Sequence, residues 1–156
     1  MRAITAAAIL VATMSGAANA STLENVTKRG TLKCSSSVGT PGFAIPDKSG
    51  KYVGLDIDFC RAIASAIFGD PDKISIVPLS PAARFTALQT GEVDVLFNTT
   101  TWTLGREATN GILFAGVNYY DGQGIMVRSG EVQSAKELNG ATICTNQGST
   151  TELNLT

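Results

Sequence analysis

The sequence predicts an α/β fold in which helices cover a parallel sheet, and three observations point to it. Short apolar, β-branched segments at residues 31–36, 74–79 and 93–97 have the length and composition of buried strands. Residues 56–68 and 80–90, which lie between them, carry apolar side chains at helical spacing. Gly- and Pro-bearing turns separate the elements. The order strand, helix, strand, helix, strand then gives parallel strands joined by right-handed crossovers.

Local signals set the expected limits of the two helices. Asp56 is expected to cap the first helix, and Gly69 supplies its stop signal. Ser80 as N-cap and Pro81 at the first helical position are expected to start the second. Asp56 and Asp58 could be read as a metal-binding or catalytic pair, but acids in a first helical turn are explained by the helix dipole and by free amides.

Further along the chain, the pattern indicates a polar loop and then a second β/α unit. The strand at residues 93–97 runs into a hydroxyl-rich loop at 98–103, which is placed where α/β folds bind ligands. Residues 119–128 look like an extended strand. Ser134 is expected to cap a short helix that ends at Leu138. A strand at 141–145 and a terminal helix after 147–150 are expected to follow.

These elements suggest a two-lobe organisation. We assign residues 1–20 to a signal peptide, 21–121 to a first lobe, 122–130 to a hinge or crossover strand, and 131–156 to the start of a second lobe. The last residues read as a helix whose apolar face has only begun, so we expect the chain to be the N-terminal part of something longer.

The first twenty residues predict export. Arg2 precedes an apolar run that is too short to span a bilayer, and Ala18-Asn19-Ala20 fits the small-x-small cleavage rule, so the mature chain should begin near Ser21 in the periplasm. The chain has 12 basic and 13 acidic residues, which makes nucleic acid and anionic membrane surfaces unlikely partners. It contains no His, which excludes Ser-His-Asp triads, Cys-His dyads and His-ligated metal sites.

Disulfides are permitted in an exported chain, and this one has three cysteines. We pair Cys34 with Cys60, because they fall in the first strand and first helix of one lobe, whereas Cys144 falls in the second. The alternative is three buried apolar thiols.

The chemistry of the loop points to carboxylate binding. Arg106 follows within one helical turn of Thr103, which can cap the short helix that carries it. Its planar guanidinium can give a carboxylate two parallel hydrogen bonds. The alternative is a surface arginine paired with Glu107 or Asp94. The turn at 147–150 would offer backbone amides at a helix N-terminus, which is a second anion-friendly position.

Several motifs together carry a resemblance to a known family. They are Pro41-Gly42-Phe43-Ala44, Gly54-Leu55-Asp56-Ile57-Asp58-Phe59-Cys60, Arg84-Phe85-Thr86-Ala87-Leu88, Thr100-Thr101-Trp102-Thr103, Tyr119-Tyr120-Asp121-Gly122-Gln123-Gly124 and Thr150-Thr151-Glu152-Leu153-Asn154. The chain with these motifs resembles the general L-amino-acid-binding periplasmic proteins of ABC importers, in solute-binding protein family 3. The resemblance implies a type II periplasmic-binding-protein-like fold with two lobes that close on a ligand.

Site residues follow from the resemblance where the motif matches. Arg106 falls on the carboxylate-binding arginine, and Thr101 and Thr150 fall on positions whose backbone amides join it. Thr99 falls where a carbonyl takes the α-ammonium. Ser37 falls where many relatives have a polar side chain that faces the ligand. Thr40 falls where many have an aromatic ring, so an aromatic lid is absent at that position. Trp102 is either a wall of the ligand cleft or a packing anchor for the loop.

The resemblance also implies a binding function without chemical conversion. We expect free L-amino acids as ligands, the membrane permease of an ABC importer as partner, a monomer, and no cofactor or metal. The alternatives are a periplasmic dehydratase on the same fold acting on an arogenate- or prephenate-type acid, and the ligand-sensing domain of a receptor. The enzyme would need a general acid or base aimed into the cleft.

Overall fold

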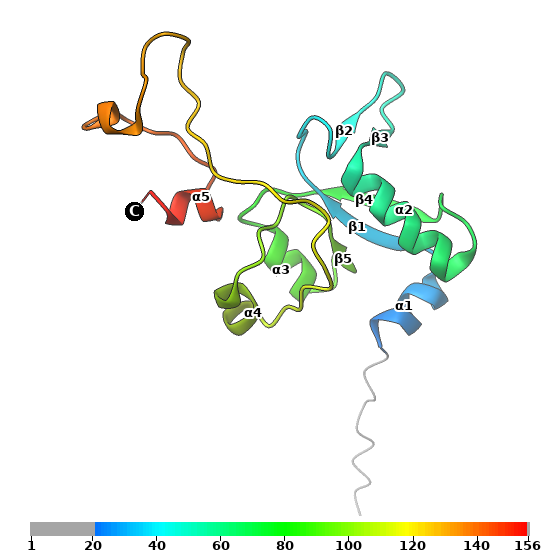
Figure 1. The fold of residues 1–156 in the computed structure, drawn as a ribbon. Helices are drawn as coiled ribbons and strands as arrows, with labels where there is room; N and C mark the ends of the chain where they lie inside the picture. The colour runs from blue at the N-terminus through cyan, green and yellow to red at the C-terminus, as the bar shows by residue number, and fades with distance from the viewer. Residues whose placement is uncertain (1–20, 156) are drawn as a thin grey trace, which may run out of the picture.

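The computed structural model describes residues 21–155, and the predicted signal peptide lies outside them. A parallel sheet of three strands in the order β4-β1-β5 forms the centre of the fold: β1 (Leu32–Ser36), β4 (Ile74–Pro78) and β5 (Val95–Leu96) (Figure 1). A small antiparallel hairpin, β2 (Ile45–Pro46) with β3 (Tyr52–Val53), lies between β1 and the next helix. The predicted α/β class with a parallel sheet is confirmed.

Helices connect the strands and cover the sheet. They are α1 (Thr22–Arg29), α2 (Leu55–Phe68), α3 (Arg84–Gln89), α4 (Leu104–Asn110) and α5 (Thr150–Leu153), with a short 3₁₀ helix η1 (Ala135–Leu138). Helix α2 packs on β1 and β4, and α3 packs on β5. The chain moves from β1 to β4 on one side and then to β5 on the other, so right-handed crossovers place α2 and α3 on opposite faces.

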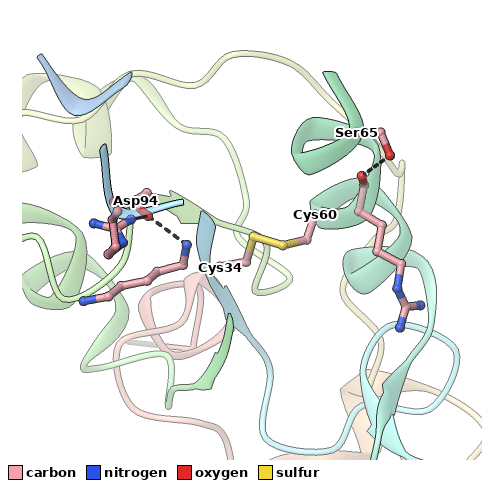
Figure 2. The surroundings of a disulfide bond; sticks show 7 residues. Cys34, Cys60, Ser65 and Asp94 are labelled. Atoms are coloured by element: carbon pink, nitrogen blue, oxygen red, sulfur yellow. Dashed lines mark hydrogen bonds and ion pairs between the residues drawn. A yellow bond between two sulfur atoms is a disulfide. The ribbon is translucent and has the colours of Figure 1, made fainter. Parts of the chain in front are cut away.

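The core lies between α1, α2 and the sheet, and the predicted disulfide is part of it. Val26, Leu32 and Ala64 are buried together with Cys34 and Cys60, which form a disulfide with a Cα–Cα distance of 6.2 Å. Figure 2 shows the bond running from β1 across to α2. The predicted pairing is therefore confirmed, and Cys144 is a free, exposed thiol.

Two expectations about helix starts were wrong: backbone carbonyls replace a capping side chain at α2, and at α3 the Ser80 hydroxyl accepts from the Ala83 amide at 3.3 Å but the helix begins later than predicted. The N-cap of α2 is Gly54, and Asp56 is a buried residue of the first turn. The amides of Leu55 and Asp56 donate to the carbonyls of Gly42 and Phe43 at 2.9 and 3.1 Å, so the first turn needs no capping side chain. Helix α3 begins at Arg84, after a turn at residues 80–83, rather than at Pro81.

Gly54 is required at the entry to α2. Its φ is +129°, and a Cβ there would meet the carbonyl oxygen of Phe43 well inside van der Waals contact. The close approach seats the loop after β1 directly on the helix. At the other end of the helix, Gly69 adopts the left-handed conformation with φ +69°, as its stop signal predicted.

The strands predicted at 119–128 and 141–145 do not form. Neither stretch pairs with another strand in the part of the chain that the structure describes, although residues 123–127 and 141–146 line a common cavity of about 560 Å³. A strand exists only as part of a hydrogen-bonded ladder, and an apolar pattern does not supply its partner. Figure 1 shows this later part of the chain as an arm that projects from the sheet.

Candidate functional site

The candidate site lies at the carboxyl edge of the sheet, between β1 and β5. The strand order reverses there, and the loops after the two strands diverge, which is where open α/β sheets form ligand crevices. The loop after β1 contains Ser37 and Thr40, and the loop after β5 is residues 98–103.

Arg106 is fixed between this loop and the turn at 147–150. Thr103 is the N-cap of α4 and its hydroxyl accepts from the Arg106 amide at 3.2 Å, as predicted. The guanidinium donates through Nη1 to the Thr101 carbonyl at 2.6 Å and through Nη2 to the Gly148 carbonyl at 3.4 Å. It also lies over the Phe85 ring, 5.2 Å from its centroid. Arg106 therefore touches both turns that the sequence singled out.

The second turn packs directly against the first part of the fold. A Cβ on Gly148, whose φ is +76°, would lie 2.8 Å from the Cα of Ala82, so only glycine fits this approach. The hydroxyls of Thr101 and Thr150 are 3.2 Å apart, although the residues are 49 positions apart in the sequence. Ser149 caps α5 with its hydroxyl, which accepts from the Glu152 amide at 3.1 Å.

Glu152 modifies the anion site expected at this turn. Its carboxylate Oε2 accepts from the Gly148 amide at 2.7 Å, so an acidic side chain of the chain itself already uses one of the amides. The spacing Ser149-x-x-Glu152 is that of a capping box, in which the glutamate reaches back to the start of the helix.

The surface ion pair considered for Arg106 is excluded. Asp94 forms its ion pair with Arg29, and Glu107 accepts from the Phe114 amide at 3.3 Å. Arg106 is only 8% exposed, and within residues 21–155 it has no ion-pair partner. Burial lowers its pKa from the usual value, as expected for a cation that water solvates poorly.

Arg84 adds a second buried guanidinium, which the sequence reasoning missed. It is 2% exposed and lies 5.1 Å from the same Phe85 ring, and it too has no ion-pair partner in the described part of the chain. Burial, and secondly the charge of Arg106, lower the pKa of Arg84 to about 10, so Arg84 is cationic at neutral pH. A guanidinium keeps its proton in proteins, so Arg106 carries a positive charge as well. The site therefore has an excess of positive charge in a poorly solvated position.

Two buried polar side chains, those of Arg84 and Asn98, fix the start of the 98–103 loop through hydrogen bonds. Arg84 Nη1 donates to the carbonyls of Asn98 at 2.8 Å and Thr99 at 3.4 Å. The Asn98 side chain donates to the Leu79 carbonyl at 2.8 Å and to the Ser35 hydroxyl at 3.2 Å. Thr99 has a φ of +42°, which is uncommon for a β-branched residue.

The remaining predicted site residues lie in two places. Ser37 is buried, and its hydroxyl has no hydrogen-bond partner among the residues that the structure describes. The Thr40 carbonyl accepts from the amides of Phe43 and Ala44 at 3.1 and 3.0 Å. Their loop and the 98–103 loop follow adjacent strands. Trp102 stacks on Phe114 with ring centroids 5.4 Å apart and an angle of 13°. This contact supports the packing role, although 46% of Trp102 is exposed.

Comparison with known proteins decides the family. The model of the bacterial extracellular solute-binding proteins, family 3, matches residues 32–150. The chain belongs to this family. The matched range includes both loops of the site and ends at Thr150, so the family 3 pattern covers the whole candidate site.

Curated relatives agree with this assignment. The chain is 52% identical over 149 residues to the general L-amino acid-binding periplasmic protein AapJ of Rhizobium johnstonii, an alignment that covers 95% of the chain and 44% of the relative. It is 54% identical over 147 residues to the glutamate/glutamine/aspartate/asparagine-binding protein BztA of Rhodobacter capsulatus, with 94% and 44% coverage. The chain thus spans less than half the length of these relatives. The protein is periplasmic, in agreement with the printed name of AapJ and with the extracellular family that it matches.

Solved structures confirm the type II periplasmic-binding-protein-like fold. An ABC transporter/periplasmic binding protein from Brucella ovis with glutathione bound superposes with a TM-score of 0.82 at 52% identity, over 87% of this chain and 43% of that chain. An ancestral amino acid-binding protein described as a precursor of cyclohexadienyl dehydratase gives a TM-score of 0.52 at 37% identity, over 57% and 38%.

Two negative findings concern the described residues alone. No group of three or more His, Cys, Asp or Glu side chains between residues 21 and 155 is arranged to hold a metal ion. In the same range, no helix is long and apolar enough to cross a membrane.

Arg84 and Asn98 are two buried residues beside the candidate site that local reasoning did not reach. Arg84 belongs to the motif at residues 84–88, but its position at the start of α3 does not indicate that its guanidinium contacts the loop after β5. No local pattern indicates that the Asn98 side chain donates to the Ser35 hydroxyl and the Leu79 carbonyl. The signal that could have found both is the sheet order, which sets α3 and β5 side by side.

Proposed function

We propose that this chain is the ligand-binding part of a periplasmic protein that binds L-amino acids and delivers them to the membrane permease of an ABC importer. The observation that carries the proposal is Arg106, a buried guanidinium that reaches both turns of the site and has no ion-pair partner between residues 21 and 155. The names of AapJ and BztA, which are amino acid-binding proteins, support the same ligand class.

In the proposed complex, the α-carboxylate of the ligand takes the bidentate face of Arg106 and the amides of Thr101 and Thr150. A carboxylate neutralises a charge that the fold leaves uncompensated, and charge-assisted bonds in a poorly solvated site are the strong ones. Arg84 strengthens the positive field and favours anionic ligands over cationic ones. The Thr99 carbonyl is the acceptor for the α-ammonium, and Ser37 and Thr40 contact the ligand from the loop after β1.

Binding without conversion fits the carboxyl groups near the site. A dehydratase would need a general acid or base that meets the ligand. Two carboxyl groups lie near the site: Asp56 is 2% exposed beside the 98–103 loop, and Glu152 accepts from the Gly148 amide at 2.7 Å, so each already has a place in holding a loop or turn of the site. We therefore propose a monomeric binding protein that neither makes nor breaks a bond.

The test is ligand titration of the complete gene product by calorimetry, with L-glutamate, L-glutamine and glutathione as probes. Glutathione is included because its γ-glutamyl end carries the same α-amino and α-carboxyl groups as a free amino acid. Arg106→Ala should weaken binding by about 2–4 kcal/mol, because one partner of a buried charged pair is removed. The affinity of Arg106→Lys should lie between those of the wild type and Arg106→Ala, since lysine keeps the charge but lacks the planar guanidinium.

Arg61→Ala is the matched control. It removes a guanidinium from α2 that pairs with Asp58 at 3.6 Å on the surface, so affinity should not change. Equal affinity of the Arg106→Ala variant and the wild type would contradict the site assignment. Loss of a probe's own NMR signals to a new product would favour the dehydratase.

A further inference from the structure

Asp56 is a buried carboxyl group that the proposed binding chemistry does not use. It lies in the first turn of α2 with its own amide fixed by the Phe43 carbonyl at 3.1 Å. Only 2% of the residue is exposed, and its Oδ2 atom has no hydrogen-bond partner within residues 21–155. Burial of a carboxylate that is incompletely hydrogen-bonded is unfavourable, so the position of Asp56 needs a physical explanation.

A role at the helix N-terminus does not account for this burial. Asp58 stands in the same turn, with 72% of its side chain exposed and an ion pair to Arg61 at 3.6 Å. An exposed acid interacts favourably with the helix dipole at no cost in desolvation. Asp56 therefore does something that its neighbour does not.

The group that Asp56 faces is the backbone of Thr99. Asp56 lies against the backbone of Thr99, a contact that opposes the rise in the pKa of Asp56 caused by burial, and both residues line a cavity of about 400 Å³ that α2, residues 94–100 and residues 112–118 enclose. On the other side of the same residue, Arg84 Nη1 lies 3.4 Å from the Thr99 carbonyl. Asp56 and Arg84 thus both contact the backbone of Thr99.

Thr99 is also the residue whose conformation needs holding. Its φ of +42° makes it the one non-glycine residue with positive φ in the described part of the chain. A β-branched side chain disfavours this region, and such strain persists only where surrounding contacts impose it. The residues that follow, Thr101 and Trp102, take their direction from this turn.

We propose that Asp56 is a positioning residue for the ligand loop: by accepting the Thr99 amide it keeps Thr99 in the left-handed conformation and so directs Thr99 and Thr101 toward the ligand. The effect on affinity rests on the proposed function, whereas the hold on the Thr99 amide does not. The two can be measured separately.

The first measurement is amide hydrogen exchange by NMR on the ligand-free complete gene product. In the wild type the Thr99 amide should be protected, and in Asp56→Ala its exchange should accelerate by about tenfold or more. Asp56→Asn keeps an acceptor oxygen and should retain most of the protection. Asp58→Ala is the matched control from the same helical turn, and it should leave Thr99 unaffected.

The second measurement is affinity for whichever of L-glutamate and L-glutamine the wild type binds more tightly. Asp56→Ala should weaken binding about tenfold, and adding Thr99→Gly should recover most of that loss, because glycine adopts positive φ without a Cβ penalty. A merely structural role of Asp56 would not be rescued by a glycine at position 99.

The proposal is overturned if the wild-type Thr99 amide exchanges at the unprotected rate, a result that needs no variant to fold. It is also overturned if Asp58→Ala has the effect of Asp56→Ala, or if Thr99→Gly fails to restore affinity. If the wild type binds neither amino acid, the proposed function fails, and the exchange rate of Thr99 still decides the role of Asp56.

Discussion

Removing the Cys34–Cys60 disulfide should lower the stability of the protein by several kcal/mol. The bond joins β1 to α2 through the centre of the core and closes a loop with a sequence separation of 26 residues (Figure 2). Cross-linking a chain across this separation removes conformational entropy from the unfolded state. The chain-entropy relation gives about 3.5 kcal/mol for it at room temperature.

Packing adds to this figure, because both sulfur atoms lie in the buried cluster with Val26, Leu32 and Ala64. Alanine at both positions deletes the sulfur atoms and leaves small voids, which destabilise a close-packed core further. The expected loss for Cys34→Ala with Cys60→Ala is therefore about 3.5 kcal/mol or somewhat more.

The assay is urea unfolding of the complete gene product under non-reducing conditions, with Cys144→Ser present in every variant to prevent thiol exchange. Cys144 is exposed and unpaired, so Cys144→Ser alone should change stability by no more than about 0.5 kcal/mol. A loss below about 1 kcal/mol in the double alanine variant would refute the entropy argument. Alkylation of Cys34 and Cys60 in the oxidised protein would refute the bond itself.

Two further predictions concern α2. Gly54→Ala should lower the free energy of unfolding by about 2–4 kcal/mol, because the new Cβ would clash with a backbone carbonyl. Gly50→Ala, where φ is +83° and no atom is near the new Cβ, should lower it by only about 1 kcal/mol. Urea unfolding measures both losses, and equal losses would contradict the close approach at Gly54. Burial raises the pKa of Asp56 to about 6, so the folded chain binds this proton more tightly than the unfolded chain. Stability from this group is therefore lowest at neutral pH, and it should rise by about 2 kcal/mol between about pH 7 and about pH 4.5 in the wild type relative to Asp56→Asn. If the wild type and Asp56→Asn differ in stability by the same amount at both pH values, Asp56 titrates with an ordinary pKa.

The behaviour of Asp56 also illustrates a conflict between stability and site geometry. A carboxylate with a raised pKa makes the fold less stable at neutral pH, where the protein would bind its ligand. Strained or unfavourable groups of this kind are retained where they fix functional geometry. The proposed positioning of Thr99 and the pH dependence of stability are thus two consequences of one buried group.

Much of the fold could be predicted because its signals are local. The strands β1 and β4, the cap of α4 by Thr103 and the left-handed stop at Gly69 each depend on residues within a few positions of one another. The pairing of Cys34 with Cys60 followed from their places in adjacent elements of one lobe. The expected strand at 141–145 failed for the opposite reason, since its existence depends on a partner elsewhere.

The sequence by itself determined the α/β class, the cysteine pairing and Arg106 as the candidate carboxylate ligand, because hydrophobic period, capping and side-chain chemistry are properties of short segments. Only the tertiary structure decided that Arg106 is buried without an ion-pair partner in the described part of the chain, that Arg84 joins it, and that Asp56 lies under Thr99. These facts depend on which segments the chain brings together across 14 to 49 positions, and no local pattern encodes such distances.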